Sequence, residues 1–205
     1  MIPVALAPEP LTFETEVRRP GSQFLKKHPK PSNNDFKQAP YWRECLGDMH
    51  KAYGGICAYS ARWLSHGTVD HFHPKSVRPD LAYEWTNYRY ASERMNSYKG
   101  DSTAVADPCS ILPGWFALDF STFFAVPGDN LPQKVTVLVS ETIRVLRLNK
   151  DNTLVEERFL AVEDYARGDV TLEYLDRRYP FIAHELRRQN LTEGIKSRFQ
   201  GLGRN

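Results

Sequence analysis

The side chains best suited to chemistry stand in a fixed order in the middle of the sequence. Asp70 and His71 are adjacent, and Asn87 and Asn96 follow them in that order. A neutral imidazole can take a proton from water near pH 7, and carboxylate and amide oxygens are ligands that Mg²⁺ prefers in proteins. A base beside one divalent ion is a minimal arrangement for hydrolysing a phosphodiester bond. The order therefore predicts a one-metal phosphodiesterase site.

A strand that ends at the base must position the first two residues. Neighbouring side chains on an extended strand point to opposite faces, so the carboxylate of Asp70 and the imidazole of His71 converge only at a strand end or a bend. Pro74 favours such a bend. His73 shares strand parity with His71 and is the alternative base, but His71 is preferred because it adjoins the carboxylate.

A helix is expected to carry the two amides. The WTN segment at 85–87 leads into a helical pattern in which Asn87 stands at the N-cap position, where its side chain can hold the loop and orient His71. Asn96 lies near the end of this pattern, and Gly100 ends it as the C′ residue. One ligand from the strand and one from the helix would then hold a single ion.

Three cations flank these residues and are predicted to contact phosphate oxygens, namely Lys75, Arg94 and Lys99. Each site residue alone has an ordinary explanation: a lone histidine is most often a plain polar residue, Asn87 alone a helix cap, and Asn96 alone a surface residue. The combination, with WTN before it and NSYKGD at its end, rarely arises by chance. The pattern as a whole therefore favours a functional site.

Residues 53–108 resemble the ββα-metal core of HNH endonucleases, and particularly small bacterial HNH proteins. The resemblance is carried by Cys57, the DHFHPK segment at 70–75, WTN at 85–87, and NSYKGD at 96–101. It implies that His71 is the general base, that Asp70 and Asn96 bind one Mg²⁺ or Mn²⁺, and that Asn87 positions the catalytic loop. The asparagine at 96 replaces the histidine that many members have there, which is a common variant.

The sequence departs from this family at the two CxxC knuckles that bind a structural zinc in many members. The first knuckle is reduced to Cys57 and Ser60, and the second to Ser92 and Met95. Serine and methionine are poor zinc ligands. No structural zinc is therefore expected.

The bulk composition is that of a globular protein. The chain has 205 residues, 41% of them hydrophobic and 25% charged, with a mean hydropathy of −0.52. Its three cysteines are widely spaced and favour a reducing cytoplasm, and no apolar run approaches the roughly 20 residues of a membrane span. The net charge is only +2, so contacts with nucleic acid must come from local clusters.

We expect an α+β fold in three regions that form one compact domain. Residues 1–40 are predicted to be an irregular basic arm, because prolines interrupt them at positions 3, 8, 10, 20, 29, 31 and 40. This arm could lie along phosphates or wrap its own domain, and both readings stay open. Residues 41–110 are predicted to form the ββα-metal core, with a helix at 41–53 that ends at Gly54-Gly55 and a strand at 56–60.

The third region, residues 111–205, is predicted to add a strand pair and a helical C-terminal half. Residues 115–126 alternate and are rich in aromatic side chains, and residues 134–139 are rich in β-branched side chains, so the two segments are expected to pair. Helical patterns follow at 142–148, 152–166, 170–179, 181–190 and 192–199.

The sequence thus predicts a metal-dependent endonuclease that hydrolyses DNA, either by nicking or, as a homodimer, by cutting both strands. One alternative is a catalytically silent module that binds nucleic acid or protein. Others are a ribonuclease toxin that acts on RNA and an obligate subunit whose helical half needs a partner. The resemblance also implies a role in bacterial defence against phage, where some similar proteins work beside an ATPase.

Overall fold

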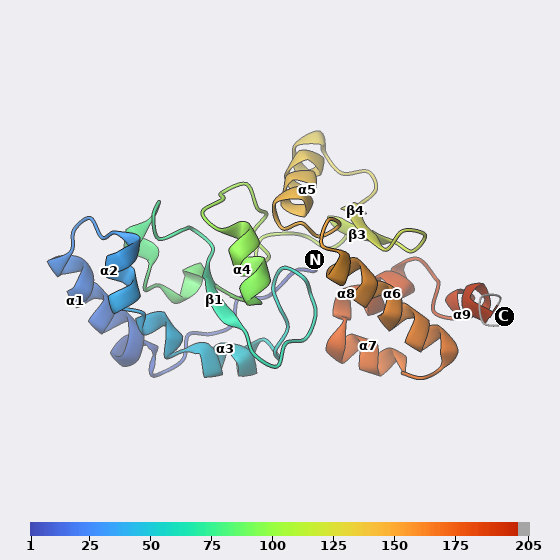
Figure 1. Cartoon of the computed structure of the whole chain (residues 1–205), viewed down its shortest axis with the longest axis horizontal. Helices are drawn as coiled ribbons and strands as arrows, with labels where there is room; N and C mark the ends of the chain where they lie inside the picture. Colours follow the sequence, from blue (N-terminus) through green and yellow to red (C-terminus); the bar gives the residue numbers. More distant parts are fainter. Residues whose placement is uncertain (201–205) are drawn as a thin grey trace.

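The computed structural model describes the backbone of residues 1–200 and the side chains of residues 1–197. Over this range the chain is α+β, with nine α-helices and two antiparallel two-stranded hairpins. Figure 1 shows helices α1 and α2 at one end of an elongated molecule, helices α6 to α9 at the other, and α3, β1, α4 and α5 between them. One hydrophobic core contains residues from Met1 to Ile195.

The predicted irregular arm is wrong, because much of it is helical. A π-helical turn at Glu14–Arg18 continues into α1 (Arg19–Lys27), and α2 (Asn33–Gln38) follows. The π turn lies directly before Pro20, which has no N–H to donate to the preceding turn. The helix therefore passes a proline that the sequence pattern treats as a break.

The hairpin and helix that contain the predicted site residues are β1 (Thr68–His71), β2 (Tyr88–Ala91) and α4 (Glu93–Lys99). The two strands are antiparallel, and Asp70 lies opposite Arg89. The helix expected directly after Asn87 is in fact strand β2, because all four of its residues are buried against β1. Ser92 is the N-cap of α4 instead, since its hydroxyl accepts the Met95 N–H at 3.2 Å.

The region before β1 agrees with the prediction in part. A 3₁₀ turn at Tyr41–Arg43 precedes α3 (Leu46–Ala52), and Gly54 and Gly55 both adopt the left-handed conformation that ends the helical segment. The predicted strand at 56–60 is absent from the described structure, where Ile56 forms only an isolated bridge with Trp63.

The second hairpin differs from the predicted strand pair. Residues 115–126 fold back on themselves as β3 (Phe116–Asp119) and β4 (Phe124–Pro127). The Asp119 carboxylate holds the tight turn by accepting the Ser121 N–H at 2.8 Å and the Thr122 hydroxyl at 2.8 Å. The expected partner strand at 134–139 is instead the first part of α5 (Gln133–Val145). Its apolar side chains pack on the core from one helical face, which overrides their preference for strands.

The helical C-terminal half is confirmed. It consists of α6 (Asn152–Arg167), α7 (Leu172–Arg178), α8 (Pro180–Arg188) and α9 (Gly194–Gln200). Gly168 ends α6 in the left-handed conformation, as its position after the apolar pattern predicts. No helix in the described part of the chain is long and apolar enough to cross a membrane.

Candidate active site

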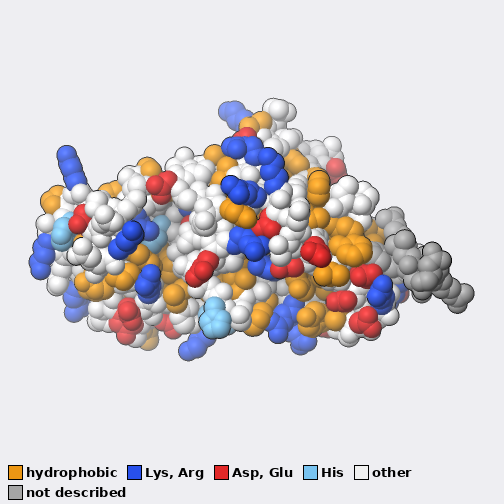
Figure 2. Space-filling view, in the orientation of Figure 1, with side chains coloured by type: hydrophobic (Ala, Val, Ile, Leu, Met, Phe, Trp, Pro, Cys, Tyr) orange, Lys and Arg blue, Asp and Glu red, His pale blue; other side chains and the backbone are white. Residues whose placement is uncertain are grey.

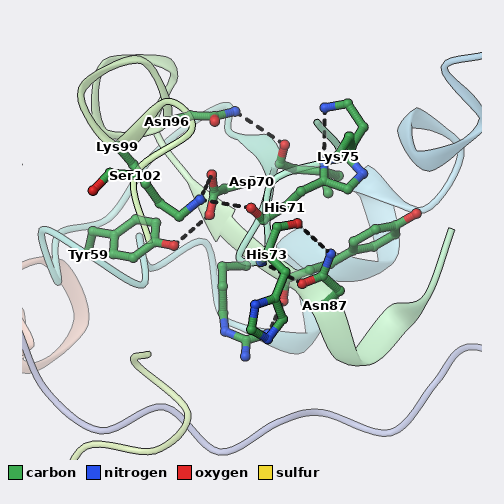
Figure 3. A network of polar contacts seen from close by, with 12 residues as sticks. Tyr59, Asp70, His71, His73, Lys75, Asn87, Asn96, Lys99 and Ser102 are labelled. Atoms are coloured by element: carbon green, nitrogen blue, oxygen red, sulfur yellow. Dashed lines mark hydrogen bonds and ion pairs between the residues drawn. The ribbon is translucent and has the colours of Figure 1, made fainter. Parts of the chain in front are cut away.

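Asp70 and His71 close strand β1, and their side chains leave it on opposite faces, as strand alternation requires. Figure 3 shows Tyr59, Asp70 and Lys99 together on one side, with Lys75 and Asn87 on the other side of the His71 backbone. No hydrogen bond between the described side chains of Asp70 and His71 joins the carboxylate to the imidazole. The two side chains are therefore not hydrogen-bonded to each other, and their convergence around one ion stays a prediction.

The Asp70 carboxylate is buried and fully engaged. Its side chain is only 2% exposed; one oxygen accepts the Tyr59 hydroxyl at 2.5 Å and the other the Lys99 ammonium at 3.1 Å. Lys99 also donates to the His71 carbonyl at 2.8 Å. Burial raises the pKa of Asp70 above its ordinary value, and the charge of Lys99 opposes that rise.

The hydrogen bonds of His71 define its tautomer. Nε2 lies 2.8 Å from the Ala82 carbonyl oxygen, which can only accept, so this nitrogen carries the proton. In the neutral ring Nδ1 then carries no proton. Its contact is the Lys75 ammonium, at 3.3 Å. Burial, and next the charge of Lys75, hold the pKa of His71 well below 6.5, which keeps the ring neutral at pH 7. His71 therefore has the protonation state of a general base.

Aromatic rings fix the orientation of this imidazole. The ring of Trp42 packs edge-to-face at 4.9 Å between centroids and that of Tyr88 at 5.1 Å. Tyr88 also donates its hydroxyl to the Ala82 carbonyl at 2.8 Å, so both lone pairs of that oxygen are used. The imidazole of His71 is thus held in one orientation by contacts on several sides.

Asn87 ties together the loop that follows His71. Its Oδ1 accepts the His73 N–H at 2.8 Å, and its Nδ2 donates to the carbonyls of His73 at 3.0 Å and Leu81 at 3.1 Å. It stands at the end of a 3₁₀ turn before β2, so it is not the N-cap that we expected. Its side chain nevertheless holds the loop that bears the alternative base, His73, whose own side chain is exposed.

Asn96 lies on the same side of β1 as Asp70 and Lys99 (Figure 3). Its Nδ2 donates to the Val69 carbonyl at 3.2 Å. No group of three or more His, Cys, Asp or Glu residues that could hold a metal exists among the described residues.

These donors do not fit a divalent ion as they stand. A cation, the Lys99 ammonium, already occupies the position beside the buried Asp70 carboxylate, and the second oxygen is held by Tyr59. A metal ion at Asp70 would have to displace Lys99. The predicted ligation by Asp70 and Asn96 therefore stays a prediction.

The three cations predicted to contact phosphate have different surroundings. Lys99 is 2% exposed and bound to Asp70. Arg94 turns away from Asp70 and pairs with Asp151 at 3.1 Å. Lys75 is the one that contacts the base, and burial lowers its pKa.

Three neighbours of the site were not predicted from the sequence. Tyr59 binds Asp70, Ala82 binds His71 through its backbone, and Trp42 packs on the imidazole. The predicted strand at 56–60 gives no indication that Tyr59 reaches Asp70, and no local pattern links residue 42 or 82 to residue 71. Tertiary packing alone brings these residues together.

Comparison with known proteins gives no family. No protein-family model matches the sequence, and no curated protein is similar to it. Function must therefore be argued from the site itself.

Proposed function

We propose that the chain is an HNH-type nuclease that hydrolyses phosphodiester bonds in nucleic acid, with DNA as its expected substrate. In this proposal β1, β2 and α4 are the ββα core of that family. The observation that carries the proposal is the state of His71: Nε2 donates its proton to the Ala82 carbonyl, and Nδ1 carries no proton in a buried, neutral ring, where its contact is the Lys75 ammonium.

The proposed step needs one proton acceptor. His71 Nδ1 takes a proton from the attacking water as the water oxygen bonds to phosphorus. The bond from phosphorus to the leaving oxygen breaks, and that oxygen takes a proton from bulk water. Asn87 keeps the adjacent loop in place. The requirement for Mg²⁺ or Mn²⁺ that the resemblance implies stays a prediction, since Lys99 holds the position beside Asp70.

The test is cleavage of supercoiled plasmid by wild type and by His71→Ala, with Mg²⁺, with Mn²⁺, and with EDTA. We expect the substitution to lower the rate about 10²- to 10⁴-fold, which is the usual contribution of a general base. His73→Ala tests the alternative base and serves as the matched control. We expect it to leave the cleavage rate unchanged, because that imidazole is exposed and only the His73 backbone contacts Asn87. Equal rates for wild type and His71→Ala would remove His71 from the mechanism.

A catalytically silent nucleic-acid-binding or protein-binding module is the second candidate. The closure of Asp70 by Tyr59 and Lys99 favours it, because an ammonium stands where the family would hold its ion. Absence of cleavage by the wild type under all three conditions would support this candidate. Matched DNA and RNA substrates in the same assay separate a DNase from a ribonuclease.

A further inference from the structure

A groove without acidic side chains lies beside the base. Its walls come from α2, from the 3₁₀ turn after it, and from the loop after β1, and they include Asn33, Phe36, Lys37, Trp42, Arg43 and Lys75. These residues combine three cations with two aromatic rings. Proteins bind single nucleic-acid strands with that combination, because cations track the phosphates and rings stack on bases.

Two of the groove's cations have no anionic partner. Lys37 and Arg43 are exposed, and among the described residues neither forms an ion pair. Lys37 donates only to the Asn34 side-chain carbonyl, at 3.3 Å. Most other exposed arginines near the ends of helices are paired, as Arg144 is with Glu141 at 2.7 Å. The charges of Lys37 and Arg43 are thus available to an outside anion.

The third cation connects the groove to the catalytic imidazole. The Lys75 ammonium lies 3.3 Å from His71 Nδ1 and 4.8 Å over the ring of Trp42. In this position it covers both the lone pair that the base needs and one face of the aromatic ring.

We propose that this groove binds the substrate strand, with Lys37 and Arg43 on backbone phosphates, and that binding draws Lys75 from His71 to a phosphate oxygen. The move bares Nδ1 for the proton of the attacking water and opens Trp42 to a nucleobase. The proposal rests on the proposed function, because it gives the route by which a strand reaches the base. The chemistry recognised is a single-stranded polynucleotide, either DNA or RNA.

A second basic surface of the same molecule is the alternative binding site for a nucleic-acid strand. Arg94, Arg144, Arg147 and Lys150 surround Tyr98 and Asp151 on the far side of α4 from Asn96. Figure 2 shows Lys and Arg side chains gathered in the middle of the viewed face, over α4 and the end of α5. Two of these four cations are already paired, with Asp151 and Glu141. Arg147 and Lys150 therefore serve as the matched pair for Lys37 and Arg43.

The experiment measures binding of fluorescein-labelled single-stranded DNA and RNA of one sequence, in EDTA, as a function of salt. Each phosphate contact contributes about 0.7 to the slope of log affinity against log salt for a single strand. Lys37→Gln/Arg43→Gln is expected to lower that slope by about 1.4, and thus affinity roughly 25-fold at about 0.1 M salt. Lys75→Gln is expected to lower the slope by about 0.7. Arg147→Gln/Lys150→Gln should leave both quantities unchanged.

The outcomes separate this inference from the proposed function. A loss of affinity for single strands that is confined to Arg147→Gln/Lys150→Gln would contradict binding in the groove, even where cleavage by the wild type depends on His71. A loss confined to the groove variants supports it even if the wild type cuts nothing, which would count against the nuclease alone. Thermal melts of every variant check that folding is unchanged, and all four substituted side chains of the two pairs are exposed.

Discussion

Two lysines lie on opposite faces of β1: Lys99 forms a buried ion pair with Asp70, and Lys75 contacts the imidazole of His71. Asp70 and Lys99 are both buried; besides their ion pair, Asp70 accepts the Tyr59 hydroxyl and Lys99 donates to the His71 carbonyl. Breaking such a pair by removing one partner typically costs about 3–5 kcal/mol, because the other charge is left buried. Among the described residues, the close partners of Lys75, on the other face, are an imidazole nitrogen and aromatic rings. Lys99 is therefore suited to holding the fold, and Lys75 to moving.

The buried neutral imidazole should make stability depend on pH. Since the folded-state pKa of His71 is lowered from 6.5, the unfolded chain binds a proton there first as pH falls. Stability is then lost below about pH 6.5. Between about pH 7 and pH 5.5 this group should cost the wild type up to about 1.3 kcal/mol, a loss that His71→Gln should not show. Urea unfolding at the two pH values gives both free energies.

The comparison cancels the other titrating groups, including Asp70. The raised pKa of that carboxyl acts with the opposite sign, since its protonated form is favoured in the folded protein, but it is present in both proteins. An identical loss of stability in wild type and His71→Gln would mean that the folded protein protonates His71, and it would remove the main support for a neutral base.

At the level of elements, the N-terminal helix α1 supports the position of His71 indirectly, through Tyr83 and Ala82. Gly21 of α1 packs so closely on Tyr83 that a Cβ at position 21 would lie 2.1 Å from the ring. Tyr83 donates its hydroxyl to the Ala39 carbonyl at 2.8 Å, and its neighbour Ala82 holds His71. The glycine thus lets an N-terminal helix, absent from the predicted fold, support the segment around Ala82 that holds His71.

Substitution of two helical glycines should have opposite effects. Gly21→Ala forces the ring of Tyr83 to shift and should lower the unfolding free energy by about 1–3 kcal/mol. Gly47→Ala in α3 meets no atom within 4 Å, so it should raise the free energy by about 0.5–1 kcal/mol through helix propensity. Urea unfolding measures both. A stabilising Gly21→Ala would show that α1 does not pack as closely as the structure has it.

The elements that the sequence could predict are those with a local signal. Gly100 and Gly168 end helices where an apolar pattern stops, and both have positive φ. The segment at 134–139 could not be assigned by the same means, because its β-branched residues prefer strands and only their tertiary contacts make them helical. Pro20 predicts a break in the N-terminal segment, but the π-helical turn at Glu14–Arg18 leads into α1 and the helix continues past the proline.

The candidate site shows the same division. The order of Asp70, His71 and Asn87 predicts that His71 ends a strand and that Asn87 holds the loop after it. Both positions are found in the structure, whereas the role of His71 as a base stays a prediction. The occupation of Asp70 by Lys99 could not be foreseen, because a sequence does not state which cation reaches a buried carboxylate. The groove could not be predicted either, because its walls come from residues 33–43 and from residue 75, which are distant in the sequence.

At the scale of the molecule, the two ends of the chain share one core. The Trp63 N–H donates to the Arg178 carbonyl at 2.8 Å, and the Arg178 guanidinium stacks on the Trp63 ring at 3.7 Å. Glu185, fully buried in α8, accepts the Leu118 N–H of β3 at 2.9 Å. An apolar patch over residues 170–191 would have supported an obligate subunit, but among the described side chains there only Tyr174 is a large exposed hydrophobic residue.

Shared contacts of this kind predict one cooperative unfolding transition. The four tryptophans, at 42, 63, 85 and 115, report on the region that contains the site, whereas most helical residues lie after residue 132. Because the core joins both parts, urea curves followed by tryptophan fluorescence and by far-ultraviolet circular dichroism should coincide. The control is Glu185→Leu, which removes the buried contact to β3 and should move both curves to lower urea together. Separate midpoints in the wild type would instead show that the helical half folds by itself, and the groove and base would then have to be studied as an independent unit.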